Sequence, residues 1–271
     1  MKNYFKQFAF LIIYLLGKIF PRNGMPVLFY HSMDESGSLL SISKKNFVRQ
    51  MNYLKESGYD SLTSQKFLEH FENRNNKSFP GKKFLVTFDD GYKNNIEAID
   101  ILKELNFSAV IFVTTGYIGG YNDFCERDVP KLPMLAMEEI RNLSKSGAEF
   151  GAHGHTHRNI TDLTNDEALS DISKSKQILE NELGSKVISF CYPRGKYASN
   201  SEKILKNLGF KIAFTSKTGI VSPKSSPYFL PRVPINDKVS DLQFKALLSP
   251  WYGFFMSLRG GRAWRGRRRN L

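Results

Sequence analysis

The sequence predicts an α/β fold in which parallel strands alternate with the helices that connect them. About seven short apolar segments alternate with about six helical ones, an order typical of parallel strands joined by crossover helices. The strand segments are almost wholly apolar, as expected of strands buried on both faces. The chain has 271 residues, so we expect one domain of barrel size rather than two small ones. This pattern alone leaves open whether the sheet closes into a barrel or stays open and doubly wound.

The expected strands are short apolar runs that stop at polar residues. They lie at residues 26–31, 84–88, 108–113, 149–152, 187–192, 211–215 and 228–233. The second of these runs stops abruptly at Asp89, Asp90 and Gly91. An uncharged apolar run bounded by such turn residues is typical of a fully buried strand.

The expected helices carry apolar residues three or four positions apart. They lie at residues 43–56, 64–71, 94–105, 137–146, 164–183 and 202–208. The clearest begins with a capping box, in which Thr164 is followed three residues later by Glu167, and it ends at Gly184. Residues 114–135 show no periodicity and contain several Gly and Pro residues, so we expect a long loop, which in compact domains is often functional.

Residues 1–25 form a short apolar segment that precedes the expected domain at residues 26–250. The charge-free window from Gln7 to Gly17 has 11 residues, about 16 Å as a helix against about 30 Å of bilayer hydrocarbon. It resembles the apolar region of a signal peptide, but no small-x-small cleavage site follows it. We therefore expect an uncleaved segment that lies in or partly across a membrane. A first helix that covers the domain and a cleaved signal are the alternatives.

Positive charge gathers at the two ends of the chain. The net charge is +13, but residues 1–22 hold four basic residues and no acid, and residues 259–271 hold six arginines and no acid. A basic groove for nucleic acid is therefore not expected on the domain. Residues 251–271 form an aromatic and Arg-rich tail, whose aromatic residues are suited either to a membrane interface or to capping the barrel. We expect both ends to bind an anionic membrane surface at the cell envelope, outside the cytoplasm, with the cytoplasmic face as the alternative.

The two cysteines, Cys125 and Cys191, are too few for a disulfide framework and lack metal-type spacing. They leave open both the compartment and whether they pair.

Candidate site residues stand where predicted strands stop, namely His31, Asp89, Asp90, His153, His157, Tyr192 and Arg232. In a parallel α/β fold these strand ends share one face, where such folds place their sites. The neighbouring aspartates should diverge in direction, so that one can bind a metal while the other acts as a base.

Asp90, His153 and His157 would make a two-histidine, one-carboxylate set of the kind that catalytic zinc uses. His155, two residues from each of the other histidines, should point away. The plainer alternatives are a turn with solvated aspartates and a polar loop with incidental histidines.

Four motifs resemble those of the polysaccharide deacetylases, the NodB-homology or carbohydrate esterase family 4 enzymes. They are Thr-Phe-Asp-Asp-Gly at 87–91, His-x3-His at 153–157, Phe-Cys-Tyr-Pro at 190–193 and Leu-Pro-Arg-Val-Pro around Arg232. The likeness runs from about residue 26 to residue 235. It implies a distorted (β/α)7 barrel and a divalent metal bound by Asp90, His153 and His157, for which zinc is the first candidate. It also implies Asp89 as the general base and an oxyanion contact from the backbone N–H of Tyr192. Arg232 either orients Asp89 through a charge-assisted pair or is only a surface residue near the site.

The chain departs from the family pattern in its general acid. Most members supply a histidine late in the chain, and this chain has none after His157. The opening Val-Leu-Phe-Tyr-His instead resembles the branch that includes deacetylases of poly-β-1,6-N-acetylglucosamine, which implies that His31 is the acid. Gly154 also stands where the family has Ser or Thr, and Arg194 follows the Tyr-Pro pair.

The resemblance implies that the protein hydrolyses N-acetyl groups of an N-acetylglucosamine-containing poly- or oligosaccharide and releases acetate. Loss of His31 or Asp89 should then lower kcat with metal content unchanged, whereas loss of Asp90 should remove the metal. Two other readings compete with this one. The chain would be a catalytically inactive carbohydrate-binding relative at the membrane surface, or a nucleic-acid protein recruited by its Arg tail.

Overall fold

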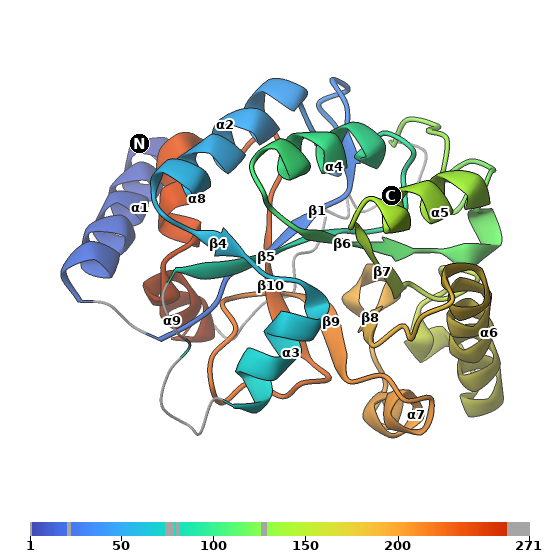
Figure 1. Ribbon diagram of the computed structural model, residues 1–271. Helices are drawn as coiled ribbons and strands as arrows, with labels where there is room; N and C mark the ends of the chain where they lie inside the picture. Colours follow the sequence, from blue (N-terminus) through green and yellow to red (C-terminus); the bar gives the residue numbers. More distant parts are fainter. Residues whose placement is uncertain (1, 21–22, 74–78, 80–81, 126–128, 259–271) are drawn as a thin grey trace.

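The structure is a computed structural model that describes residues 2–20, 23–73, 79, 82–125 and 129–258, with only the backbone at residues 2–6 and 256–258. Its centre is a barrel of parallel strands surrounded by helices (Figure 1). The barrel strands are β1 (Val27–Tyr30), β5 (Lys83–Phe88), β6 (Ala109–Val113), β7 (Glu149–Ala152), β8 (Ser189–Cys191), β9 (Ile212–Thr218) and β10 (Leu230–Pro234).

The barrel closes because β1 pairs with two neighbours. Leu28 of β1 lies opposite Val233 of β10 and also opposite Val86 of β5, and both pairings are parallel. The ring is irregular where β7 and β8 share a single pair of residues and where the register of β10 shifts against β9. This architecture confirms the distorted (β/α)7 barrel and resolves the choice between a barrel and an open sheet.

The helices lie around the outside of this ring. They are α1 (Lys2–Ile19), α2 (Lys44–Glu56), α3 (Ser64–Glu72), α4 (Asn95–Glu104), α5 (Met137–Lys145), α6 (Asn165–Leu183), α7 (Ser201–Asn207), α8 (Asp241–Leu247) and α9 (Pro250–Leu258). The short elements are β2 (Ser32–Met33), β3 (Ser41–Ile42), β4 (Asp60–Ser61) and the 3-10 turns η1 (Thr115–Tyr117), η2 (Ile160–Asp162) and η3 (Pro193–Gly195). The capping box predicted at Thr164 is present, and Gly184 ends α6 at a φ of 64°.

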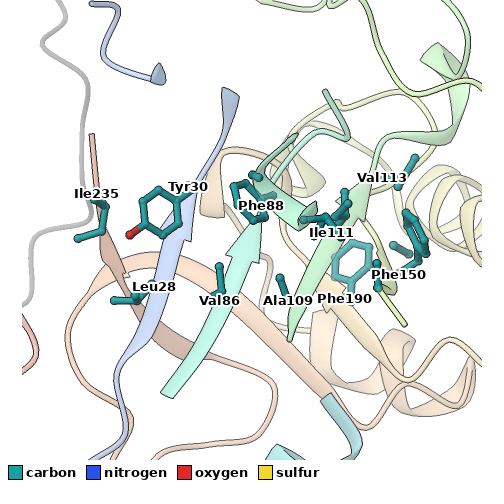
Figure 2. Close-up of a cluster of buried hydrophobic side chains, with 14 of the residues drawn as sticks. Leu28, Tyr30, Val86, Phe88, Ala109, Ile111, Val113, Phe150, Phe190 and Ile235 are labelled. Carbon is teal, nitrogen blue, oxygen red and sulfur yellow. The ribbon is translucent and has the colours of Figure 1, made fainter. Parts of the chain in front are cut away.

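The strand side chains alternate between the helices and the barrel interior. Figure 2 shows one buried cluster of strand side chains, among them Leu28, Tyr30, Val86, Phe88, Ala109 and Ile111. The residues between them belong to a second buried cluster, which contains Val27, Leu85, Val110, Cys191, Ile212, Phe214 and Leu230. The strand residues of the second cluster alternate with those of the first along β1, β5, β6 and β8, so the second cluster is the barrel interior. Phe67 and Phe71 of α3 belong to it as well, so α3 packs against the interior residues.

The terminal helices pack together on one side of the barrel (Figure 1). Gly17 allows α1 to approach Ser249, the ring of Phe10 stacks on Tyr252 at 6.4 Å, and the Trp251 indole donates to the Phe20 carbonyl at 2.7 Å. The sequence reading missed α8 and α9. In the parts of the chain that the structure describes, no helix is both long and apolar enough to cross a bilayer. The predicted arginine tail at 259–271 lies outside the described residues.

Candidate active site at the carboxyl end of the barrel

The inward phase of the strands brings the candidate residues together. Asp89 follows Leu85 and Thr87 at intervals of two, and His31 follows Val27 and Phe29 in the same way. Because alternate residues of a strand share a face, this phase points their side chains into one end of the barrel. Asp89, Asp90, His153 and Arg232 are all buried there. The strand ends therefore converge as the sequence predicted.

Asp89 and Arg232 form a bidentate ion pair inside the barrel. The two terminal guanidinium nitrogens of Arg232 donate to the two carboxylate oxygens of Asp89 at 2.7 and 2.8 Å. The Arg232 Nε donates to the Thr215 carbonyl at 3.0 Å, and its guanidinium lies 3.7 Å from the ring centre of Phe29. Arg232 is 1% exposed. It is therefore not a surface residue, and it holds Asp89 in one orientation.

The charge state of Asp89 follows from this pair. Burial alone would raise the pKa of the Asp89 carboxyl, but the charge and hydrogen bonds of Arg232 outweigh burial and hold that pKa below its ordinary value. The thiol of Cys191 also donates to Asp89 Oδ2 at 3.3 Å. Asp89 is thus kept as a carboxylate, the form that a general base requires.

Asp90, His153 and His157 meet on the other side of the same strand end. The Nε2 atoms of both histidines lie 3.3 Å from Asp90 Oδ1. This buried oxygen has no hydrogen-bond partner. Burial opposes ionisation of Asp90, yet the two histidines hold its pKa well below the ordinary value. Two of the three residues have backbones in the left-handed region, Asp90 at a φ of 76° and His157 at 58°. Such strain is rare outside glycine and persists at functional sites.

These three residues fit a divalent metal. In a tetrahedral zinc site with bonds of about 2.0 to 2.1 Å, two ligand atoms lie about 3.3 to 3.4 Å apart, which is the edge length of the tetrahedron. The two distances of 3.3 Å match that value. His153 Nδ1 lies 2.7 Å from the Cys191 carbonyl. A hydrogen bond there puts the proton on Nδ1 and leaves Nε2 free to bind a metal.

A second set of possible ligands is less suited to a metal. Asp89, His153 and Cys191 also offer ligand atoms within 4.8 Å of one another. Both oxygens of Asp89 already accept hydrogen bonds from Arg232. The Asp90 set, whose carboxylate oxygen lacks a partner, is therefore the candidate metal site.

His31 follows β1 at the same end of the barrel. Burial lowers the pKa of its imidazole and outweighs the opposing negative charges of Asp90 and Asp89. Its carbonyl accepts a hydrogen bond from the Asn95 side chain of α4 at 2.7 Å. The ring centre lies 4.6 Å from that of Phe29. His155 points away as predicted, with Nδ1 at 3.0 Å from the Thr115 hydroxyl.

The role expected for Tyr192 is wrong in this structure. Its backbone N–H donates to the Phe214 carbonyl at 3.1 Å as part of the pairing between β8 and β9. An N–H engaged in a sheet ladder does not point at a developing oxyanion. The Tyr192 side chain belongs to the cluster that faces the helices. The site therefore has no oxyanion donor at Tyr192.

Sequence reasoning missed several supporting residues. Cys191 touches Asp89, and Phe29 lies against both Arg232 and His31. The signal that could have found them was their position in the sequence. Phe29 stands two residues before His31 and so faces the same way, and Cys191 is the last residue of a strand that ends beside the site. Asn95 gave no such signal, because its contact with His31 spans 64 residues. Both cysteines are free thiols.

The fold and this site define a barrel hydrolase with an oriented carboxylate base beside a three-residue metal-type cluster. The sequence model of the family described as polysaccharide deacetylase matches residues 76–213, just over half of the chain. The chain belongs to the polysaccharide deacetylase family, hydrolases that act on N-acetyl amide bonds.

Individual relatives agree with this membership. A poly-beta-1,6-N-acetyl-D-glucosamine N-deacetylase of Staphylococcus aureus (strain MRSA252) is 26% identical over 237 residues, which cover 84% of this chain and 77% of the relative. The structure of IcaB from Ammonifex degensii superposes with a TM-score of 0.73 at 27% identity, covering 84% of this chain and 97% of the other. Streptococcus pyogenes deacetylase PplD shares the fold with a TM-score of 0.74 at 22% identity, covering 84% and 99%.

Proposed function

We propose that the protein is a metal-dependent N-deacetylase of a glycan that contains β-1,6-linked N-acetylglucosamine, from which it releases acetate. The observation that carries this proposal is that two neighbouring aspartates at one strand end have different surroundings. Asp89 is held as a base by Arg232, and Asp90 faces two histidines at ligand-to-ligand distances. The name of the relative in Staphylococcus aureus supports the choice of sugar.

Asp90, His153 and His157 would hold the metal, for which zinc is the first candidate given the two nitrogen ligands and one carboxylate. Bound there, a divalent ion supplies Lewis-acid activation of the acetamide carbonyl and of a water molecule. Three protein ligands would leave a position open for water or substrate.

The other residues would move protons. Asp89 takes the proton from the attacking water through Oδ1, which keeps a second lone pair after accepting from Arg232, whereas Oδ2 accepts from both Arg232 and the Cys191 thiol. His31 donates a proton to the departing amine. Burial and the neighbouring carboxylates act in opposite directions on the pKa of His31. The products are acetate and a free amino group on the sugar.

An acetate-release assay tests the proposal. Metal-loaded protein is incubated with oligomers of β-1,6-linked N-acetylglucosamine and, separately, with β-1,4-linked oligomers, and released acetate is measured over time. We expect release from the β-1,6 series that stops when a chelator removes the metal. Release that is indifferent to the chelator contradicts metal dependence, and equal release from the β-1,4 series contradicts the proposed linkage.

A carbohydrate-binding relative without turnover is the second candidate. It would bind the same oligomers and release no acetate under any metal. The intact Asp89, Asp90 and two-histidine set argues against it, because binding alone needs neither a base nor a metal-type cluster.

We infer further that the protein works at an anionic membrane surface of the cell envelope, outside the cytoplasm. One face of α1 packs on the barrel side, and the opposite face exposes apolar side chains three or four residues apart, namely Phe8, Leu11, Ile12, Leu15 and Ile19. Phe8 is 62% exposed and Ile19 is 64% exposed. Residues 1–22 carry four basic residues and no acid. An apolar stripe with basic flanks is suited to the boundary between acyl chains and anionic headgroups.

Vesicle co-sedimentation tests this inference. We expect the protein to bind vesicles that contain phosphatidylglycerol, and Leu11→Glu or Leu15→Glu to weaken binding. Leu169→Glu on α6, where the leucine is 42% exposed, is the matched control and should bind as the unaltered protein does. Equal binding by all four proteins, or self-association in place of vesicle binding, contradicts the inference.

A further inference from the structure

The loop that carries the histidine ligands is held from outside the barrel by a single carboxylate. Asp171 lies in α6 and is 9% exposed. Its Oδ2 accepts the backbone N–H of His155 at 2.8 Å. Its Oδ1 accepts the backbone N–H of Thr156 at 2.9 Å and the Thr156 hydroxyl at 2.6 Å. All three donors lie between the two histidine ligands in the sequence.

The opposite side of the loop is held by η1. The backbone N–H of Thr115 donates to the Gly154 carbonyl at 3.2 Å, and that of Gly116 donates to the His155 carbonyl at 2.9 Å. Asp171 thus binds the backbone N–H groups of His155 and Thr156, and η1 binds the carbonyls of Gly154 and His155. The loop is therefore fixed between two elements that do not themselves reach the metal-type cluster.

Glycine at position 154 allows the carboxylate to come this close. Gly154 has a φ of 76°, and a Cβ at that position would lie 2.7 Å from Asp171 Oδ2. The glycine thus meets two requirements at once, since other residues are strained in that conformation and would also displace the carboxylate. Three residues further on, His157 has a φ of 58°. A strained backbone of this kind costs about 1–3 kcal/mol and persists only where the surroundings enforce it.

We propose that Asp171 is a positioning residue, which holds residues 154–156 so that His153 and His157 keep their Nε2 atoms directed at Asp90. No hydrogen bond joins it to a ligand side chain, and it acts through the backbone of residues 155 and 156 and the Thr156 hydroxyl. The proposal rests on the metal site of the proposed function but not on the substrate. Hydrogen bonds from two backbone N–H groups and one hydroxyl to a charged carboxylate are strong enough to fix a loop of this length. An ordinary structural aspartate would contribute to folding alone.

The experiment compares Asp171→Asn with Asp166→Asn, a substitution of the same chemistry at an exposed site of the same helix. Asparagine offers a single acceptor oxygen, so at least one of the clamped N–H groups loses its partner. We expect Asp171→Asn to weaken Co²⁺ binding by about 10- to 100-fold, the range seen when groups that orient metal ligands are removed. The Co²⁺ absorption bands should change as well. Asp166→Asn should bind Co²⁺ as the unaltered protein does.

Two further measurements separate this proposal from other failures. In metal-free protein, the amides of His155 and Thr156 should exchange their hydrogens faster in Asp171→Asn and at the ordinary rate in Asp166→Asn. This comparison tests the clamp even if the unaltered protein binds no metal or releases no acetate. Thr156→Val removes one of the three bonds and should weaken Co²⁺ binding several-fold less than Asp171→Asn does. It remains informative if Asp171→Asn fails to fold.

Unchanged Co²⁺ affinity and spectrum in folded Asp171→Asn would overturn the positioning role. A fall in melting temperature without any change in metal binding would assign Asp171 to folding alone. Protected amides at His155 and Thr156 in metal-free Asp171→Asn would show that η1 suffices to hold the loop.

Discussion

Asp89 and Asp90 are neighbours in the sequence and opposites in their surroundings. The oxygens of Asp89 accept hydrogen bonds from Arg232 and from the Cys191 thiol. Asp90 Oδ1 is equally buried and has no hydrogen-bond partner, although two imidazole nitrogens lie 3.3 Å away. Both residues are 3% exposed, so burial does not distinguish them.

The difference shows how one strand end can hold two chemical roles. A buried carboxylate that accepts hydrogen bonds from protein groups is stable without a bound cation and keeps a fixed orientation. A buried carboxylate oxygen without a donor is costly unless a cation completes it. The left-handed backbone of Asp90 turns its side chain away from the barrel-facing pair and towards the histidine loop.

The largest effect is expected from Asp90→Ala. Removing the carboxylate leaves two histidines, which are too few to hold a catalytic zinc. We expect metal content, measured by mass spectrometry of the purified protein, to fall to background, and acetate release to fall with it. If the variant keeps its metal, the metal does not bind at Asp90.

Asp89→Asn should separate catalysis from metal binding. Asparagine keeps the shape but cannot take a proton, so we expect kcat to fall by about 10²- to 10⁴-fold. Metal content should stay at the level of the unaltered protein. Parallel loss of metal in this variant would show that the two aspartates do not have separate roles.

Arg232→Met should destabilise the fold by about 3–5 kcal/mol at pH 7, because it leaves the buried Asp89 carboxylate unpaired. Urea unfolding in the presence of a chelator measures this loss. Asp90→Asn under the same conditions should cost less, because asparagine keeps an acceptor oxygen for the two imidazoles and leaves no charge buried without a partner. Equal losses in the two variants would remove the contrast between the carboxylates.

The same pair makes stability depend on pH. Arg232 holds the folded-state pKa of Asp89 below its ordinary value against the effect of burial. A depressed pKa contributes stability that is present above about pH 4, near the pKa of the unfolded chain, and is lost as pH falls through the folded pKa. The gap in unfolding free energy between unaltered protein and Arg232→Met should therefore narrow below pH 4. A gap that is constant from pH 7 to pH 3 would contradict the ion pair.

Tyr192→Phe should have the smallest effect. The Tyr192 hydroxyl is buried without a hydrogen-bond partner, and the backbone N–H is engaged with Phe214. We expect kcat within about twofold and a slightly higher melting temperature, since an unsatisfied buried hydroxyl is removed. A large fall in kcat would show that Tyr192 takes part in catalysis.

Much of the barrel was predictable because each strand is a short apolar run that stops at a polar residue. The alternation of these runs with helices fixed the parallel order, and the residues at the strand ends converged as expected. Closure was not predictable from periodicity, because it depends on β1, the first strand of the ring, pairing with β10, the last, where Leu28 lies opposite Val233 across 205 residues of chain. Helix α9 was missed because its aromatic residues were attributed to a terminal tail at 251–271, and α8 lies in the last part of the expected domain, where no helix was predicted.

Within the site, the sequence predicted the metal-type triad and the divergence of the two aspartates. It did not predict the backbone that achieves them, because positive φ values at Asp90 and His157 arise from tertiary contacts rather than local preference. The Tyr192 assignment failed for a related reason. Whether a backbone N–H is free depends on the neighbouring strand, which here is β9.

Metal binding by unaltered protein and by Asp90→Ala and Asp89→Asn, measured together by calorimetric titration with Zn²⁺, tests the central claim most directly. The account predicts one ion per chain for the unaltered protein and for Asp89→Asn, and none for Asp90→Ala. Identical binding by all three proteins, or loss in Asp89→Asn with retention in Asp90→Ala, would contradict it.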